Sequence, residues 1–104
     1  MNEKEKYLFL DIAMNLNRLG EWVTEDYKNK KGRIDIILSQ NREYINKLNI
    51  SLLSDQSQKT FRHFLKIYPS LEEQIRKEDK WDLVLGENLM TWGNILTHKA
   101  SLII

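Results

Sequence analysis

Two histidines are the first side chains to consider for chemistry, because imidazole changes its charge near neutral pH and often ligates metals. His63 and His98 stand far apart in the sequence, and neither has a second histidine at metal-binding spacing. A carboxylate-bridged di-iron bundle requires Glu-x-x-His on two helices. Thr60 and Ile95 occupy the glutamate positions here. We therefore predict no metal site and interpret His63 as a surface or boundary histidine on a short amphipathic helix. An enzyme or metal protein centred on His63 is kept as a less favoured hypothesis.

Other catalytic motifs are absent from the sequence. The chain has no cysteine, which excludes a disulfide framework, a thiolate zinc site and a cysteine nucleophile. No Gly-x-Ser-x-Gly nucleophile motif and no glycine-rich phosphate loop occur. Carboxylates cluster at Glu72 and Glu73, where the favourable helix dipole at a predicted helix start explains them. We predict a protein that is not an enzyme, with no catalytic residue and no cofactor.

Basic residues suggest an alternative function, which is binding to nucleic acid. Four lie in one six-residue run and two more lie further along the chain: Lys28, Lys30, Lys31, Arg33, Arg62 and Lys66. A shared basic surface would suit nucleic acid, which proteins bind largely through phosphate contacts. The acidic residues Glu21, Glu25 and Asp26 dilute the charge just upstream. We favour a solvated loop at positions 28–33, and a nucleic-acid-binding regulator remains the alternative.

The elements that would position these residues are predicted to be helices. The chain has one proline and four glycines, which are too few turn-forming residues for the many turns of a β protein. Apolar residues recur at helical spacing throughout. We predict an all-α antiparallel four-helix bundle spanning residues 1–104 as one domain. The expected helices cover about 2–27, 33–48, 54–69 and 70–97, so the first and last are long and the middle two short, and the tail at positions 98–104 is expected to dock on the bundle or on a partner.

The last predicted helix shows apolar residues on two sides. Pro69 should end the preceding helix, and Ser70 stands three residues before Glu73, which is capping-box spacing. One broad arc is core-like: Trp81, Val84, Leu85, Leu89, Trp92, Ile95 and Leu96. Opposite it runs what we call the glycine seam: Leu83, Gly86, Met90 and Gly93. If Gly86 instead ends the helix, this seam disappears.

The unequal helix lengths suggest a partner. Two long helices packed against two short ones would leave apolar surface uncovered, which a dimer interface can bury. Leu10 and Met14 also lie off the main apolar face of the first helix. We therefore predict a small non-catalytic adaptor, regulator or inhibitor that forms a homodimer or binds another protein through the glycine seam, with Leu10 and Met14.

Composition sets the remaining bounds on function. The chain has 104 residues and a net charge of +1, so its overall charge indicates no particular partner. No apolar run reaches the length of a signal peptide core or a membrane span. We expect a cytoplasmic protein that does not associate with membranes.

Overall fold

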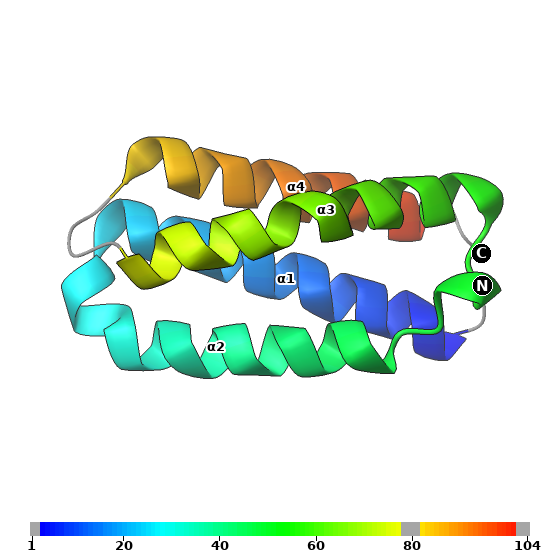
Figure 1. Ribbon diagram of the computed structural model, residues 1–104, viewed down its shortest axis with the longest axis horizontal. Coiled ribbons are helices and arrows are strands. Elements are labelled where there is room, and N and C mark those ends of the chain that lie inside the picture. Colours follow the sequence, from blue (N-terminus) through cyan, green and yellow to red (C-terminus); the bar gives the residue numbers. More distant parts are fainter. Residues whose placement is uncertain (1–2, 78–81, 102–104) are drawn as a thin grey trace.

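The computed structural model describes residues 3–77 and 82–101, and nearly all of these residues are helical (Figure 1). The four main helices are α1 (Glu3–Glu25), α2 (Tyr27–Lys47), α3 (Asp55–Lys77) and α4 (Leu83–Ser101). A short 3-10 helix, η1 (Ile50–Leu52), precedes α3. The described part of the chain contains no strand. The prediction of an all-helical protein is therefore confirmed.

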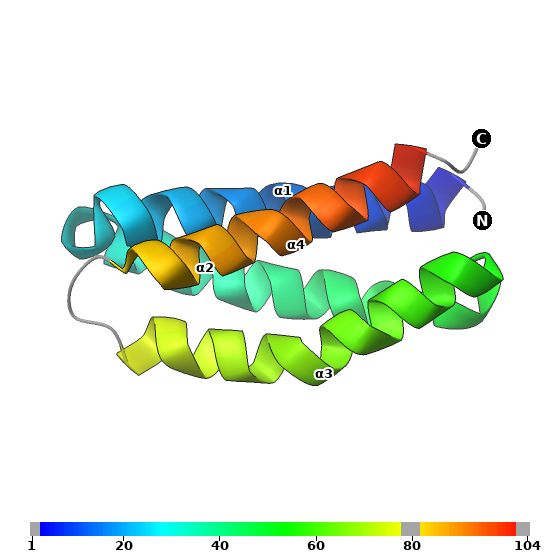
Figure 2. The same cartoon turned by 90° about the horizontal axis from the view of Figure 1, so that it is seen from above.

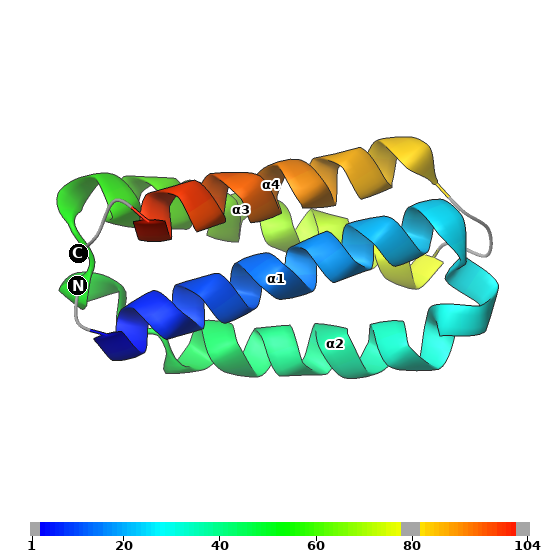
Figure 3. The ribbon, with the colours of Figure 1, turned by 180° about the vertical axis from the view of Figure 1, so that it is seen from behind.

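The molecule measures 38 × 21 × 21 Å, and the helices lie side by side along its longest dimension (Figures 1 and 3). The ribbon colours in Figure 1 run from one end of the molecule to the other and back along successive helices. The most extensive pairing joins α1 to α4, and α1 also packs against α2. Helix α1 is therefore central to the packing, which is compatible with a helical bundle.

The core follows the apolar spacing of the sequence. Phe9, Ile12, Leu16, Leu19 and Val23 recur at intervals of three or four residues on α1, and all are fully buried. Three aromatic contacts continue this core into α3. The ring centroids are 5.3 Å apart for Phe9–Phe61, 5.5 Å for Phe61–Phe64 and 5.0 Å for Phe64–Tyr68.

Helix α3 continues through Pro69, so the predicted helix end at this residue is wrong. A proline inside a helix costs about 3 kcal/mol, because it removes a backbone donor and crowds the preceding turn. Leu71 and Ile75 extend the apolar stripe beyond Pro69 and are buried. Burying them contributes about 1.5–3 kcal/mol each, which offsets the cost. Figure 2 shows that α3 changes direction near its middle, as expected of a helix that contains proline.

Helix α4 begins at Leu83 rather than at Ser70. The Asp82 carboxylate accepts a hydrogen bond of 3.0 Å from the Leu85 amide, which caps this helix. The helix then runs unbroken through Gly86 and Gly93, as predicted. All four main helices contain 19 to 23 residues, so the prediction of short middle helices is wrong. The predicted core residue Trp81 and the chain's last three residues lie outside the described residues.

The predicted loop at positions 28–33 is also wrong, because α2 already begins at Tyr27. Only Asp26 separates α1 from α2. Tyr27 is buried, and its hydroxyl donates a 2.7 Å hydrogen bond to the carbonyl of Ile75 in α3. This anchor accounts for the early start of the helix. Gly32 therefore lies inside α2, where it forms no turn.

Candidate interaction surfaces

The glycine seam lies largely against α1 of the same chain. An added Cβ atom on Gly86 would stand 2.7 Å from the Gly20 carbonyl oxygen, and one on Gly93 would stand 2.6 Å from Asn17 Oδ1. An added Cβ on Gly20 would approach Met90 Cγ to 2.5 Å. These small residues allow the two helix backbones to approach closely. Gly86, Met90 and Gly93 thus contribute to packing inside the bundle.

The other residues predicted for this interface are more exposed. Leu83 retains 50% of its accessible surface and Met14 retains 49%, whereas Leu10 is half-buried. The structure adds Tyr7, which is 59% exposed and lies two helical turns before Met14 on α1. Sequence reasoning missed Tyr7, although its spacing of seven residues from Met14 was a usable signal. Val84, expected in the core, is instead 67% exposed.

The predicted basic residues lie on two helices, α2 and α3. The contact between Tyr27 and Ile75 places the start of α2 beside the end of α3. Arg62 precedes Ile75 by 13 residues, which corresponds to about 20 Å along a helix. Lys28, Lys30, Lys31 and Arg33 lie in the first two turns of α2, which begins near one end of the molecule (Figure 1). Lys66 stands at the middle of α3, nine residues before Ile75, and Arg62 lies about one turn further from that end.

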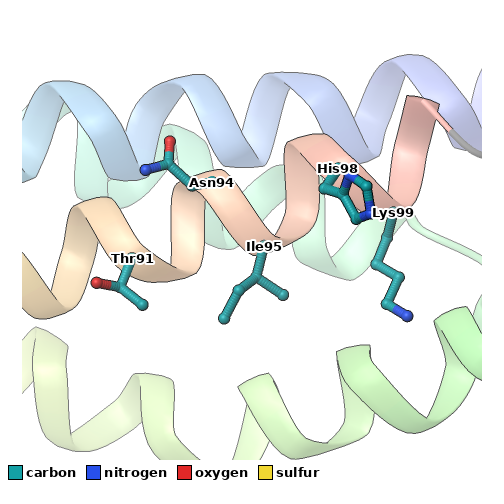
Figure 4. Close-up of a pocket in the computed structure, with 5 residues that line it drawn as sticks. All are labelled: Thr91, Asn94, Ile95, His98 and Lys99. Carbon is teal, nitrogen blue, oxygen red and sulfur yellow. The ribbon is translucent and has the colours of Figure 1, made fainter.

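The two histidines occupy different settings. The ring of His63 meets Trp92 edge-on, with centroids 5.4 Å apart, and Trp92 also packs 5.6 Å from Phe64. His98 instead lines a shallow groove of about 470 Å³ on α4, shown in Figure 4; the other lining residues are Thr91, Asn94, Ile95 and Lys99. In the described residues, no group of three or more His, Asp or Glu side chains is placed to hold a metal ion.

A polar network that crosses the core was not predicted. Asn15 donates to Gln40 Oε1 at 3.1 Å and to Asn41 Oδ1 at 3.3 Å. Asn41 donates in turn to the Tyr68 hydroxyl at 3.1 Å. The network thus joins α1, α2 and α3 through groups that are mostly buried. In the sequence, Gln40 and Asn41 interrupt the apolar spacing of α2, and that spacing does not indicate which residues they contact.

Charged side chains lie beside the Tyr68 end of this network. The Arg42 guanidinium contacts the Glu72 carboxylate and lies 5.3 Å from the centre of the Tyr68 ring. Glu72 is buried, and Arg76 approaches it to 3.9 Å. Burial raises the pKa of Tyr68, while the hydrogen bond from Asn41 and the charges of Arg42 and Arg76 oppose that rise. Burial therefore favours the neutral form of Tyr68, which is linked through Asn41 and Asn15 to α2 and α1.

Comparison with known proteins supplies no relative. No protein-family model, no curated protein and no solved structure matches this chain. Within the described residues, every helix is too short or too polar to span a membrane. Assignment of a function therefore depends on the surfaces described above.

Proposed function

We propose that this protein is a non-catalytic interaction module: an antiparallel four-helix bundle that associates with a second copy of itself. Its role would be that of a cytoplasmic adaptor, regulator or inhibitor. Binding would use the outer surfaces of α1 and α4 rather than the glycine seam, since Gly86 and Gly93 pack against α1.

One observation carries the proposal. Four of the large hydrophobic side chains that stay exposed belong to the closely paired helices α1 and α4: Tyr7, Met14, Leu83 and Val84. Each contributes about 1.5–3 kcal/mol when it is fully buried, before the cost of association. Exposed apolar residues on two adjoining helices provide apolar area that a partner can bury.

The interior of the bundle supports a binding role. Among the described residues, no buried side-chain nitrogen or oxygen lacks a hydrogen-bond partner. Asn15 and Asn41 use their amides to join helices. Satisfied polar groups of this kind favour a single packed structure that can present a defined outer surface.

The mass of the protein in solution tests this proposal. Sedimentation equilibrium over a wide concentration range should show a shift from the chain mass of 12.5 kDa toward twice that value. A protein that keeps the mass of one chain at millimolar concentration would contradict self-association. Gly93→Leu is unsuitable as a dimer probe, because its side chain would collide with Asn17 and the Ala13 carbonyl within the same chain.

A further inference from the structure

The exposed side of α1 carries a continuous line of seven side chains, of which Tyr7 and Met14 are apolar or aromatic and the other five are charged. Positions 4, 7, 11, 14, 18, 21 and 25 alternate in spacing between three and four residues. Such spacing keeps side chains on one side of a helix, with a drift of about 20° per heptad, as at a coiled-coil contact. Six of these residues are exposed and Asp11 is half-buried. We call this line the α1 stripe, and no helix of the same bundle covers it.

The charges on the α1 stripe are arranged symmetrically around Met14. Asp11 precedes Met14 by three residues and Arg18 follows it by four. Further out, Lys4 precedes it by ten residues and Glu25 follows it by eleven. In both pairs, the two residues carry opposite charges, while Glu21 has the uncharged Tyr7 as its counterpart seven residues before Met14. The α1 stripe is therefore complementary to its own reversed copy.

Within residues 3–77 and 82–101, none of these four charged side chains forms an ion pair. Elsewhere, surface charges pair along one helix, as in Lys47–Glu43 at 3.2 Å and Lys77–Glu73 at 2.7 Å. In the described residues, no ion pair includes a charged side chain of the α1 stripe. These charged groups remain available to a second molecule.

The two outer charges also oppose the dipole of their own helix. Lys4 stands in the first turn of α1, where the dipole favours negative charge, and Glu25 ends the helix, where it favours positive charge. A second α1 helix packed antiparallel would make both charges favourable. The acidic end of the second α1 would then lie beside the basic start of the first, and the two helix dipoles would oppose one another.

We propose that two copies of this protein dock through their α1 stripes, antiparallel, with a two-fold axis near Met14. Asp11 then faces Arg18 of the partner subunit, Lys4 faces Glu25 of the partner subunit, and the two Met14 side chains meet. This inference rests on the proposed self-association and names its surface. A parallel pairing would place each charge beside its own copy, which is repulsive. One helix face buries a small area, so we expect a weak, salt-sensitive dimer.

Two single charge reversals test the arrangement. Asp11→Arg and Arg18→Asp each place like charges opposite one another in a homodimer. Each should raise the dimer dissociation constant at least about tenfold, measured by sedimentation at low salt. Both positions face solvent wholly or in part, so circular dichroism should show an unchanged helix content. Asp35→Arg makes the same change on the exposed surface of α2 and should leave the dissociation constant unaltered.

Mixing the two variants gives the sharper result. The new arginine at position 11 of one variant would face the new aspartate at position 18 of the other, and the native Arg18 and Asp11 would also face one another. The mixture should therefore form a heterodimer of wild-type strength, although neither variant associates well alone. The double variant Asp11→Arg/Arg18→Asp should likewise recover homodimerisation.

The outcomes separate this inference from the general proposal. If the wild type dimerises and neither charge reversal changes the dissociation constant, docking through the α1 stripes is wrong. Self-association would then use another surface. A mixture that stays monomeric would also overturn docking through the α1 stripes. A wild-type protein that is monomeric at every concentration would overturn both proposals.

Discussion

Gly20 of α1 and Gly86 of α4 face one another, such that an added Cβ on either would stand 2.7 Å from the other's carbonyl oxygen. Side chains of ordinary size cannot occupy such a contact. The Thr24 hydroxyl, which donates a 2.8 Å hydrogen bond to the Gly20 carbonyl, lies in the same crowded region beside Gly86. The closest helix pairing of the molecule thus depends on the absence of two side chains.

Gly86→Ala should destabilise the protein by about 1–3 kcal/mol, because the added methyl group would force the helices apart. Chemical denaturation monitored by circular dichroism would measure the change. The matched control is Gly32→Ala in α2, where nothing lies within 4 Å of the added Cβ. That variant should stabilise the protein by up to about 1 kcal/mol through helix propensity alone. Equal effects of the two substitutions would contradict the close α1–α4 contact.

Asp82→Ala should cost about 1 kcal/mol, since it removes the side-chain cap of α4. Thermal or urea denaturation would detect the loss, and Asp82→Asn should retain most of the stability because asparagine also caps helices. Asp26 serves as a control: it precedes α2, but its side chain makes no capping hydrogen bond to that helix. Asp26→Ala should change stability by less than about 0.5 kcal/mol. A larger loss at Asp26 than at Asp82 would contradict the assigned caps.

Tyr68→Phe should destabilise the fold by about 1–3 kcal/mol, because it leaves the buried Asn41 amide without its acceptor. The ring itself is preserved, so the loss would report the hydrogen bond rather than a cavity. Tyr44→Phe is a suitable control, since Tyr44 is half-buried and no hydrogen bond of its hydroxyl is found in the described structure. If both variants matched the wild type in urea, the core network would have no measurable role in stability.

Alkaline pH should weaken the fold through the same residue. Burial raises the pKa of Tyr68 above its ordinary value of 10.0. Its contribution is thus fully present below pH 10, where tyrosine is neutral in both the folded and unfolded states. Above pH 10 the unfolded chain loses this proton first, so stability falls as pH rises toward the folded pKa. Urea midpoints measured from pH 9 to 11 should therefore fall more steeply for the wild type than for Tyr68→Phe. Parallel curves for the two proteins would contradict the raised pKa.

The helical spacing of apolar residues correctly predicted buried faces where tertiary contacts agreed with local helix preference. The apolar spacing on the first helix predicted the buried face that contains Phe9, Ile12 and Leu16. Capping and breaking signals were less reliable. Pro69 and Ser70 form a strong local start signal, yet α3 passes through both residues because Leu71 and Ile75 are buried further along. The local preference against a helix at Pro69 amounts to a few kcal/mol. Burial of the continuous apolar face of α3 contributes more than this.

The candidate interaction surface was predictable only in part. Met14 and Leu10 could be identified because they lie off the core face of a predicted helix. The roles of Gly86 and Gly93 could not be identified in this way. Glycine at helical spacing is compatible with a contact inside one bundle or between two chains. Only the position of Gly20 and Asn17 opposite them decides in favour of the first.

The sequence by itself determined that the chain is helical, which residues form most of its core, and the charge pattern of the α1 stripe. These properties depend on residue type and spacing along one helix. Tertiary structure alone decided where α3 ends, that positions 28–33 are helical, and that Asn15, Asn41 and Tyr68 meet. Each of these outcomes depends on contacts between residues distant in the sequence, whose combined free energy exceeds the local preferences that sequence rules measure.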